Sequence, residues 1–376
     1  MSRPSRDDLY EQVRRADFNR TEPETVRQLV ESAIRIGDEI KNDYVRLRQL
    51  TDDILELLKK EDLIKSRKFR KEELAPFYNR ITSATDGSFQ YVGGSDGIWY
   101  APISVSLIIF HKGINSVPDV RIGARICPID ERKHPNVVGT METLMLSAEA
   151  NIIRDWCRDC PEGAILFMDG PVIDPPRLMS RDYVTYRVET IQSCLDKGVF
   201  VLGCVKRLLG DPLMEYLCTL PNLRDYEKDR IRGFFSDAHM IYYVFTKASL
   251  QGGMTIYTKP LEIGDNKIYK PYKEAGLKIY FMYFQLNYGT KPFRVEIPVK
   301  GDLEIDLEQL GEQVAATLCA WSYPGYDLPL PIVIAHEKCN IRRGCAEVIY
   351  REIITRAASI DVFDNLVRTK LGTEVL

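Results

Sequence analysis

Apolar positions recur with a helical period near the start of the chain. Between residues 24 and 62 they fall mostly three or four residues apart, at Leu29, Ala33, Ile36, Ile40, Tyr44, Leu47, Ile54 and Leu58. This spacing places them on one face of an α-helix. Thr21 is expected to cap this helix, with Glu24 three residues later and Pro23 in the first turn. Two interpretations stay open: an arm packed on its own domain, and a surface for a partner or a dimer.

A strand-like pattern follows a link over residues 65–73 that is rich in Lys, Arg and Glu. Residues 83–92, 99–111 and 117–127 are rich in β-branched and aromatic side chains, and short segments containing Gly and Asp or Asn separate them. Such joints favour hairpins. Three sequential antiparallel strands are therefore expected.

The spacing of apolar residues then changes again. Residues 143–158 and 181–197 show a helical pattern, whereas 164–168 and 199–205 are short, continuous apolar runs. Continuous runs of this length are typical of buried parallel strands. The order β-β-β-α-β-α-β predicts an α/β fold with a mixed sheet, three antiparallel strands followed by parallel strands, and helices on its faces.

The rest of the chain is expected to add helices and one hairpin. The predicted elements are a charged helical insert at 211–232, a strand at 239–246, a hairpin of 277–286 and 293–299, and helices at 303–321 and 340–360. The predicted organisation is an N-terminal helical segment over 1–75 and one α/β domain over 76–376, with the charged insertion around 207–236.

Composition is that of an ordinary globular protein. Of the 376 residues, 45% are hydrophobic and 28% are charged, and the net charge is −3. These values exclude a disordered or collagen-like chain, and they give no overall basic surface of the kind typical of nucleic-acid-binding proteins. The longest apolar stretches, 103–110 and 199–205, are far shorter than the roughly 20 residues of a membrane span, so no membrane association is expected.

The nine cysteines are expected to be reduced thiols. The chain begins without the apolar segment of a secretory signal, so a cytoplasmic location is expected. Cys157 and Cys160 form a Cys-x-x-Cys pair, but a structural zinc site needs four ligands and no second close pair follows. Cys339 and Cys345 could complete such a site only through the fold, and zinc is not the favoured interpretation.

Two aspartates mark the predicted sheet as a site. Asp86 lies in Thr-Asp-Gly-Ser within the first strand, where an unpaired carboxylate is costly to bury. Asp169 ends the apolar run 164–168, at the carboxyl end of a predicted parallel strand, where open α/β sheets place ligands. Each Asp-Gly alone would be read as a turn. Together, in this strand order, they favour a site for Mg²⁺ or Mn²⁺, which prefer carboxylate ligands.

A third acidic ligand is expected from the helix between these strands. Glu142 and Glu149 are seven residues apart and share one helical face. Glu149 lies between alanines, which leaves room for an ion, whereas Glu142 is nearer the helix start, where an acid has a macrodipole explanation. Glu149 is the preferred candidate, with Glu142 as the alternative.

Histidine and basic residues supply further candidates. His336, one of four histidines, closes an apolar run before the last long helix and is read as a fourth ligand or an acid–base group, with Glu337 as a substitute. Lys206 and Arg207 follow the run 199–205 directly. They would either meet a scissile phosphate or form a surface pair at the strand exit.

The predicted hairpin carries charged and aromatic side chains. Arg294, with Glu296 beside it, is a further candidate for a phosphate contact. The aromatic residues are Tyr280, Phe281, Tyr283, Phe284 and Tyr288. Aromatic residues on a strand can stack on single-stranded bases, but a core position is the favoured interpretation.

Short motifs occur in a fixed order along the chain. They are Asp-Gly-Ser at 86–88, Met-Asp-Gly-Pro at 168–171, Gly-Cys-Val-Lys-Arg at 203–207, Arg-Val-Glu-Ile-Pro at 294–298 and Ala-His-Glu at 335–337. Taken together they resemble the NurA nucleases of archaea and some bacteria. The resemblance implies an RNase H-like fold, in agreement with the strand order, preceded by a variable helical segment.

The resemblance also implies a function. NurA nucleases use Mn²⁺ or Mg²⁺ to degrade single-stranded DNA from 5′ to 3′ and to cut single- and double-stranded DNA internally. They act as homodimers beside the hexameric HerA ATPase, in DNA end resection for recombinational repair. A cytoplasmic DNA nuclease with two metal ions per site is therefore expected.

Site residues carry over one by one. Asp86 and Asp169 match the strand aspartates of the family, Glu149 its helix glutamate, Lys206 a basic residue and His336 its late histidine. The implied mechanism is hydrolysis at metal held by the three acids, with Lys206 or a second ion at the leaving oxygen. His336 is a further ligand or a proton shuttle.

Two other classes of function compete with this one. One is an inactive RNase H-like scaffold for a partner ATPase, and the other is a different phosphoryl-transfer metalloenzyme. The sequence contains no Gly-x4-Gly-Lys-Ser/Thr motif. ATP-driven movement along DNA would therefore depend on a partner.

Overall fold

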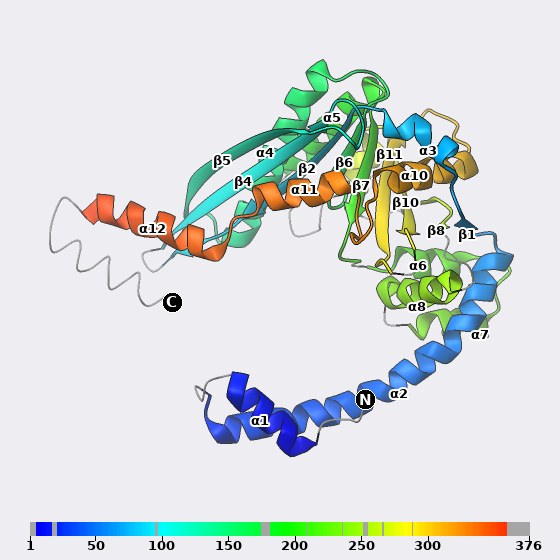
Figure 1. Ribbon diagram of the computed structural model, residues 1–376, viewed down its shortest axis with the longest axis horizontal. Helices are drawn as coiled ribbons and strands as arrows, with labels where there is room; N and C mark the ends of the chain where they lie inside the picture. The colour runs from blue at the N-terminus through cyan, green and yellow to red at the C-terminus, as the bar shows by residue number, and fades with distance from the viewer. Residues whose placement is uncertain are drawn as a thin grey trace.

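The computed structural model describes residues 5–16, 21–94, 97–173, 181–208, 210–234, 236–250, 255–264, 267–287 and 289–358. Across these residues one mixed sheet of 11 strands forms the centre of the molecule (Figure 1). The strands are β1 (Ile64–Arg67), β2 (Thr82–Phe89), β3 (Val92–Gly93), β4 (Ile98–Phe110), β5 (Asp119–Asp130), β6 (Ile165–Asp169), β7 (Phe200–Val205), β8 (Thr255–Thr258), β9 (Leu261–Glu262), β10 (Leu277–Gln285) and β11 (Phe293–Lys300).

Helices surround the sheet and extend beyond it (Figure 1). They are α1 (Arg6–Ala16), α2 (Pro23–Lys60), α3 (Lys71–Tyr78), α4 (Val137–Asp159), α5 (Arg181–Asp196), α6 (Pro212–Thr219), α7 (Asp225–Arg232), α8 (Asp237–Ser249), α9 (Lys270–Glu274), α10 (Leu307–Trp321), α11 (Leu330–Cys339) and α12 (Arg343–Ala358). No helix in the described part of the chain is both long and apolar enough to cross a membrane.

The strand order confirms the RNase H-like mixed sheet. The central order is β11-β7-β6-β2-β4, and β5 pairs with the far side of β4. β2 pairs antiparallel with β4, and β4 antiparallel with β5, whereas β6 lies parallel to both β2 and β7. The antiparallel strands β2, β4 and β5 are thus followed by two parallel strands, β6 and β7, which the chain reaches through α4 and α5. The spacing of apolar residues along the sequence predicts this order.

Helices cover both faces of this central sheet. Successive side chains of a strand point to opposite faces. On β4, Leu107 and Ile109 therefore join a core with α4, whereas Ile108 and Phe110 join a core with α10 and α11. All four are nearly or completely buried. A strand buried on both faces must be apolar throughout, which explains the long apolar run in its sequence.

The strand predicted at 239–246 is wrong, because this segment lies in helix α8. The Ser236 hydroxyl accepts a hydrogen bond from the backbone N–H of His239, so it caps the helix start. The buried side chains of α8 include Met240, Ile241, Val244 and Phe245, which share one helical face. The β-branched and aromatic residues that suggested a strand are therefore the inner face of a packed helix.

Helix α2 forms an arm. Figure 1 shows α2 running away from the sheet, with α1 packed beside its N-terminal half. The predicted cap Thr21 is wrong: the Glu22 side chain accepts hydrogen bonds from the N–H groups of Glu24 and Thr25. One face of the C-terminal half of α2 is buried, at positions that include Leu47, Ile54 and Leu58, whereas Ile36 and Ile40 in its first half are exposed. After α2 the chain continues into β1, which pairs antiparallel with β8 of the sheet.

A buried carboxylate holds the charged insertion onto the sheet. Asp237 is fully buried, and its oxygens accept hydrogen bonds from Leu213 N at 2.7 Å, Met214 N at 2.9 Å and the Tyr283 hydroxyl at 2.6 Å. These contacts satisfy the first turn of α6, where free N–H groups attract an acid. Burial raises the pKa of Asp237 to about 6, against the hydrogen bonds that lower it.

Asp237→Asn is expected to lower stability by about 1–3 kcal/mol, because an amide cannot accept from both N–H groups and the hydroxyl. The folded-state pKa lies above the ordinary value, so the wild type gains stability as pH falls and loses it as pH rises through 6. The difference in melting temperature between the wild type and Asp237→Asn should therefore become smaller as the pH is raised from about 4.5 to about 8. Asp229→Asn, on the exposed face of α7, serves as the control; a gap independent of pH would contradict the assignment.

Candidate active site

Neighbouring parallel strands bring two aspartates together. In the register of β2 and β6, Thr85 lies beside Met168, so Asp86 and Asp169 come next on the two strands. Both carboxylates are almost completely buried. Asp86 Oδ1 accepts a hydrogen bond from the N–H of Gly87 at 2.8 Å. The two carboxylates predicted as metal ligands are thus side by side at the carboxyl end of β6.

Helix α11 brings His336 to this pair. Its Nδ1 lies 2.7 Å from Asp86 Oδ2 and 3.8 Å from Asp169 Oδ2. In the sequence His336 appeared to precede a helix, but it lies near the end of α11. Two hydrogen bonds hold this helix and the turn after it on the sheet. The Ser106 hydroxyl of β4 donates to Ala335 O at 2.7 Å, and Ile341 N donates to Ser88 Oγ at 3.2 Å.

These three side chains offer a set of ligands for a metal ion. One ligand atom from each of Asp86, Asp169 and His336 lies within 4.8 Å of the others, and among the described residues no other His, Cys, Asp and Glu side chains converge in this way. Cys157 and Cys160 are buried between α4 and α5, where the Cys157 thiol donates to Ser193 O. The structure therefore gives no support to a zinc site at the Cys-x-x-Cys pair.

Lys206 follows β7 and reaches the same site. Its Nζ lies 2.5 Å from Asp169 Oδ2, and its side chain is partly exposed. Arg207, the next residue, is exposed. Of the two basic residues at this strand exit, Lys206 is the one that contacts Asp169.

Burial and mutual repulsion shape the charges of the site. The pKa of Asp169 is raised to about 6, first by burial and then by the neighbouring Asp86 carboxylate, while Lys206 opposes the shift. The same surroundings raise the pKa of the Cys339 thiol on α11, through burial, Asp86 and, more weakly, Glu149. The neighbouring carboxylates of Asp86 and Asp169 repel each other when both are ionised, so binding of a divalent cation between them would be favoured.

Glu149 lies beside this group but outside it. It is buried on α4, and its carboxylate rests against Gly87, the residue after Asp86. Side chains alternate along β2, so Asp86 faces α11 while the bare Cα of Gly87 faces α4. The absence of a side chain at Gly87 lets Glu149 reach the sheet. Glu142 lies two turns earlier on the helix, roughly 10 Å away along its axis.

The sequence did not indicate the role of the residues that hold this site in place. Glu296 on β11 is buried, and its Oε2 accepts hydrogen bonds from Val172 N at 2.9 Å and Ile173 N at 3.1 Å, in the loop that follows Asp169. Arg294 pairs with Glu296 at 2.9 Å and is therefore a support for this loop rather than an exposed phosphate contact. A signal was present for Ser106: it is one of two serines within an otherwise apolar strand.

The aromatic residues of the hairpin belong to the core, as favoured from the sequence. Tyr280, Phe281, Tyr283 and Phe284 are buried among apolar side chains on both faces of β10. Tyr288 lies outside the described residues. The buried four are not available to stack on bases.

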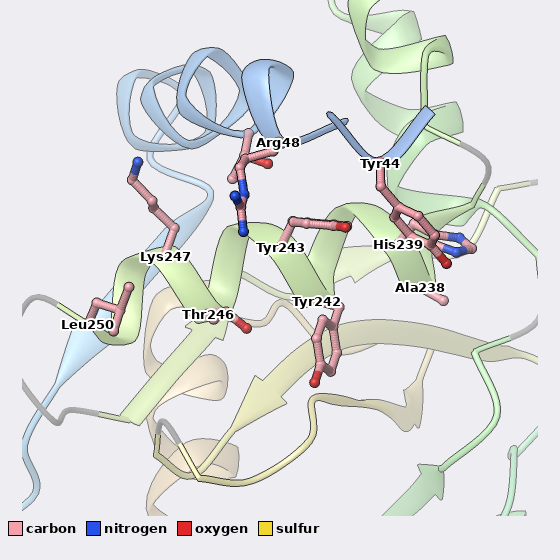
Figure 2. Close-up of a pocket in the computed structure, with 10 residues that line it drawn as sticks. Tyr44, Arg48, Ala238, His239, Tyr242, Tyr243, Thr246, Lys247 and Leu250 are labelled. Atoms are coloured by element: carbon pink, nitrogen blue, oxygen red, sulfur yellow. The ribbon is translucent and has the colours of Figure 1, made fainter. Parts of the chain in front are cut away.

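A pocket lies elsewhere, between α2 and α8. Figure 2 shows Tyr44 and Arg48 from α2 facing Tyr243 and His239 from α8. The cavity that these residues line has a volume of about 620 Å³. None of the acidic site residues lines it. The candidate active site is thus the cluster of Asp86, Asp169 and His336 on the sheet and not this pocket.

Comparisons with known proteins agree with this fold. A family model described as NurA domain matches residues 80–341. The crystal structure of the NurA nuclease from Sulfolobus solfataricus is similar, with a TM-score of 0.55 and 13% identity, over 89% of this chain and 98% of that chain. A crystal structure of NurA bound to dAMP and manganese has a TM-score of 0.44 and 10% identity, over 85% of this chain and 96% of that chain. No curated protein sequence matches the chain.

The fold and the acidic site define the class of protein: a nuclease, an enzyme that hydrolyses the phosphodiester bonds of DNA, built on an RNase H-like sheet. Because the family model spans well over half of the chain, the particular family is also shown. The chain belongs to the NurA family, as the order of its motifs predicts.

Proposed function

We propose that this nuclease is metal-dependent, that it degrades single-stranded DNA from 5′ to 3′, and that it cuts single- and double-stranded DNA internally. The observation that supports metal dependence is the convergence of Asp86, Asp169 and His336 on one point of the sheet. Polarity and strand preference rest on membership of the NurA family.

The side chains present fit Mn²⁺ or Mg²⁺. Two buried carboxylates supply hard oxygen ligands. Burial and then the neighbouring Asp86 carboxylate raise the pKa of Asp169, and a divalent cation would offset the repulsion between the two acids. Asp86, Asp169 and His336 would hold one ion. Glu149, beside Gly87, is the fourth candidate ligand. A bound divalent ion would lower the pKa of its water and neutralise charge on the scissile phosphate.

The remaining roles fall to His336 and Lys206. The His336 Nδ1 lies against Asp86, so the opposite edge of the ring is left for a proton or a second contact. Lys206 places a positive charge at Asp169. With a divalent ion held by the acidic pair, the Lys206 ammonium would be available to stabilise the negative charge that develops on the leaving 3′ oxygen.

Lys206→Ala is expected to separate cleavage from metal binding. Loss of a positive charge at the leaving oxygen should reduce the cleavage rate by about 10²-fold. Metal affinity should stay the same or rise, because the lysine no longer competes for Asp169. Titration calorimetry with Mn²⁺ and single-turnover cleavage measure the two effects, and Arg207→Ala is the matched control. A fall in metal affinity with unchanged cleavage at saturating metal would overturn this role.

We also propose that the protein acts in the cytoplasm as a homodimer with a hexameric HerA-type ATPase, in DNA end resection for recombinational repair. Family membership supports the partner. Free cysteines throughout the described residues support a reducing compartment.

The experiment that tests the function is cleavage of end-labelled single-stranded DNA in EDTA, Mg²⁺ or Mn²⁺, with Asp86→Ala as the control. Cleavage that needs metal and disappears in the variant is expected. Circular dichroism must show that the variant is folded. If the wild type cleaves nothing with either metal, alone or with the ATPase, the function is that of an inactive scaffold. Metal-dependent turnover of nucleotides without DNA cleavage would instead indicate another phosphoryl-transfer enzyme.

A further inference from the structure

The pocket between α2 and α8 is built from two helical stripes that face each other. Residues three or four apart on a helix share a face. The pocket takes three residues with this spacing from each helix: Tyr44, Arg48 and Thr51 from α2, and His239, Tyr243 and Thr246 from α8. Beside the pocket the two helices share one buried core, to which Leu47 and Val244 belong. The walls of the pocket are therefore set by packed helices and not by loops.

Tyrosine rings form much of the lining. Tyr44 is 45% exposed and Tyr242 is 53% exposed, while Tyr243 is partly buried. The pKa of Tyr243 is raised by burial and then by Tyr44, and Arg48 opposes the shift, so these three polar groups lie close to one another. Figure 2 shows the Arg48 side chain extending from α2 toward α8. An exposed ring of this kind can stack on a flat aromatic ligand such as a nucleic acid base.

The charged residues of the lining are basic. Arg48 and Lys247 line the pocket together with the imidazole of His239, and none of the described lining residues is an acid. This local excess runs against the net charge of −3 of the whole chain. Arg48 is exposed, and no carboxylate of the described residues forms an ion pair with it. Lys247 Nζ lies 2.7 Å from Asp52 Oδ1, but both side chains are largely exposed, so this contact is weak.

Rings and positive charge together define the chemistry of a ligand. The volume of about 620 Å³ is in the range of sites for small molecules. A guanidinium binds phosphate oxygens through two parallel hydrogen bonds, and a base stacks on an aromatic ring. A ligand that carries both groups uses both features of the pocket. Phosphate alone would leave the rings in water, and an apolar ligand would leave Arg48 without a partner.

We propose that this pocket binds a nucleoside 5′-phosphate, with the phosphate at Arg48 and the base against the rings of Tyr44 and Tyr243. This unit occurs as a free mononucleotide and as the repeating unit of a single strand, and its chemistry is the same in both. The pocket shares no residue with the cluster of Asp86, Asp169 and His336. It is therefore a second nucleotide site on the nuclease, and it needs no metal.

Titration calorimetry of the full-length protein in EDTA tests the phosphate contact. EDTA keeps divalent ions from the acidic cluster, so the result does not depend on metal-dependent cleavage. The probes are dAMP, deoxyadenosine and a short single strand of oligo(dA). Arg48→Ala should weaken dAMP binding by at least about tenfold, because a charge-assisted contact is lost. Deoxyadenosine has no phosphate, so its binding should not respond to this change.

The matched control is Arg46→Ala. Arg46 is also exposed on α2, but it lies two positions before Arg48, on the other side of the helix, and it does not line the pocket. It removes the same charge from the chain and should leave the affinity for dAMP within a few-fold of the wild type.

Tyr44 tests the stacking contact. Tyr44→Ala should weaken dAMP binding by about tenfold, whereas Tyr44→Phe keeps the ring and should bind within a few-fold of the wild type. Both Tyr44 and Arg48 are exposed, so the melting temperatures without ligand should match that of the wild type.

The two nucleotide probes distinguish the sources of the ligand. Binding of dAMP that responds to Arg48→Ala and Tyr44→Ala assigns the pocket to a free nucleotide, and the same response with oligo(dA) alone assigns it to a strand. Three outcomes would overturn the proposal: neither probe binds, both pocket variants bind like the wild type, or Arg46→Ala weakens binding as much as Arg48→Ala. Cleavage with Mn²⁺ is measured separately, and its absence would remove the proposed metal-dependent function and not this site.

Discussion

Asp169→Asn is expected to abolish metal-dependent cleavage while making the metal-free fold more stable. Asparagine keeps the shape of the side chain and loses the charge that binds metal. Lewis-acid stabilisation is worth several kcal/mol, so the cleavage rate should fall by at least about 10³-fold. In the metal-free protein the Asp169 carboxylate lies buried beside Asp86, and its pKa is raised to about 6. Removing the charge removes that repulsion.

The effect of Asp169→Asn on the stability of the metal-free protein is expected to grow as pH rises. The folded-state pKa of Asp169 lies above its ordinary value, so the ionised group destabilises the fold once pH rises through 6. In EDTA the asparagine variant should therefore melt higher than the wild type at about pH 8, and the difference should shrink toward about pH 5. Loss of the Lys206 contact acts in the other direction, but that side chain is partly exposed and the contact is correspondingly weak.

In the presence of Mn²⁺ the wild type should melt at a higher temperature than Asp169→Asn, the reverse of the order in EDTA. A ligand that binds only the folded state raises the melting temperature in proportion to its binding free energy, so the wild type should gain and the variant should not. Asp155→Asn, an exposed position on α4, is the matched control and should respond to Mn²⁺ like the wild type. An equal Mn²⁺ shift in Asp169→Asn, or retained cleavage, would show that Asp169 is not a ligand.

The two aspartates could be predicted from the sequence because each one interrupts a pattern. Asp86 is a charged residue within an otherwise strand-like segment and Asp169 ends an apolar one, and the change from strand-like to helical spacing indicated the order of these elements along the chain. The order of the strands along the chain favoured a shared site, but it is the parallel pairing of β2 with β6, with Thr85 beside Met168, that places the two carboxylates together.

Contacts between distant segments could not be predicted in this way. Glu296 supports the loop at Val172, 124 residues away, and nothing local distinguishes it from any acid on a strand. The helix α8 was misread because its β-branched and aromatic residues prefer strands, and burial against the sheet overrides that preference. His336 was singled out as the end of an apolar run, but only its place on α11 explains how it reaches Asp86.

Gly87→Ala is expected to impair both the fold and the active site. The backbone at this position accepts alanine, since its φ is not in the left-handed region, so any effect comes from space. An added Cβ would lie 2.8 Å from Met145 Cγ and 3.2 Å from Glu149 Cδ, and it would overlap Glu149 Oε1. Overpacking of this kind costs about 1–3 kcal/mol. The carboxylate must then leave the sheet, and cleavage should fall by at least tenfold if Glu149 serves the metal site.

The double variant Gly87→Ala with Glu149→Ala separates crowding from chemistry. Shortening Glu149 frees the space, so the double variant should be less destabilised than the sum of the single changes. Cleavage should not recover, because the carboxylate is absent. Gly37→Ala is the matched control: nothing lies within 4 Å of the added Cβ on the arm, and the helix should gain about 0.5–1 kcal/mol. Gly87→Ala with wild-type cleavage would place Glu149 outside the catalytic machinery, and additive stabilities would show that the two residues do not touch.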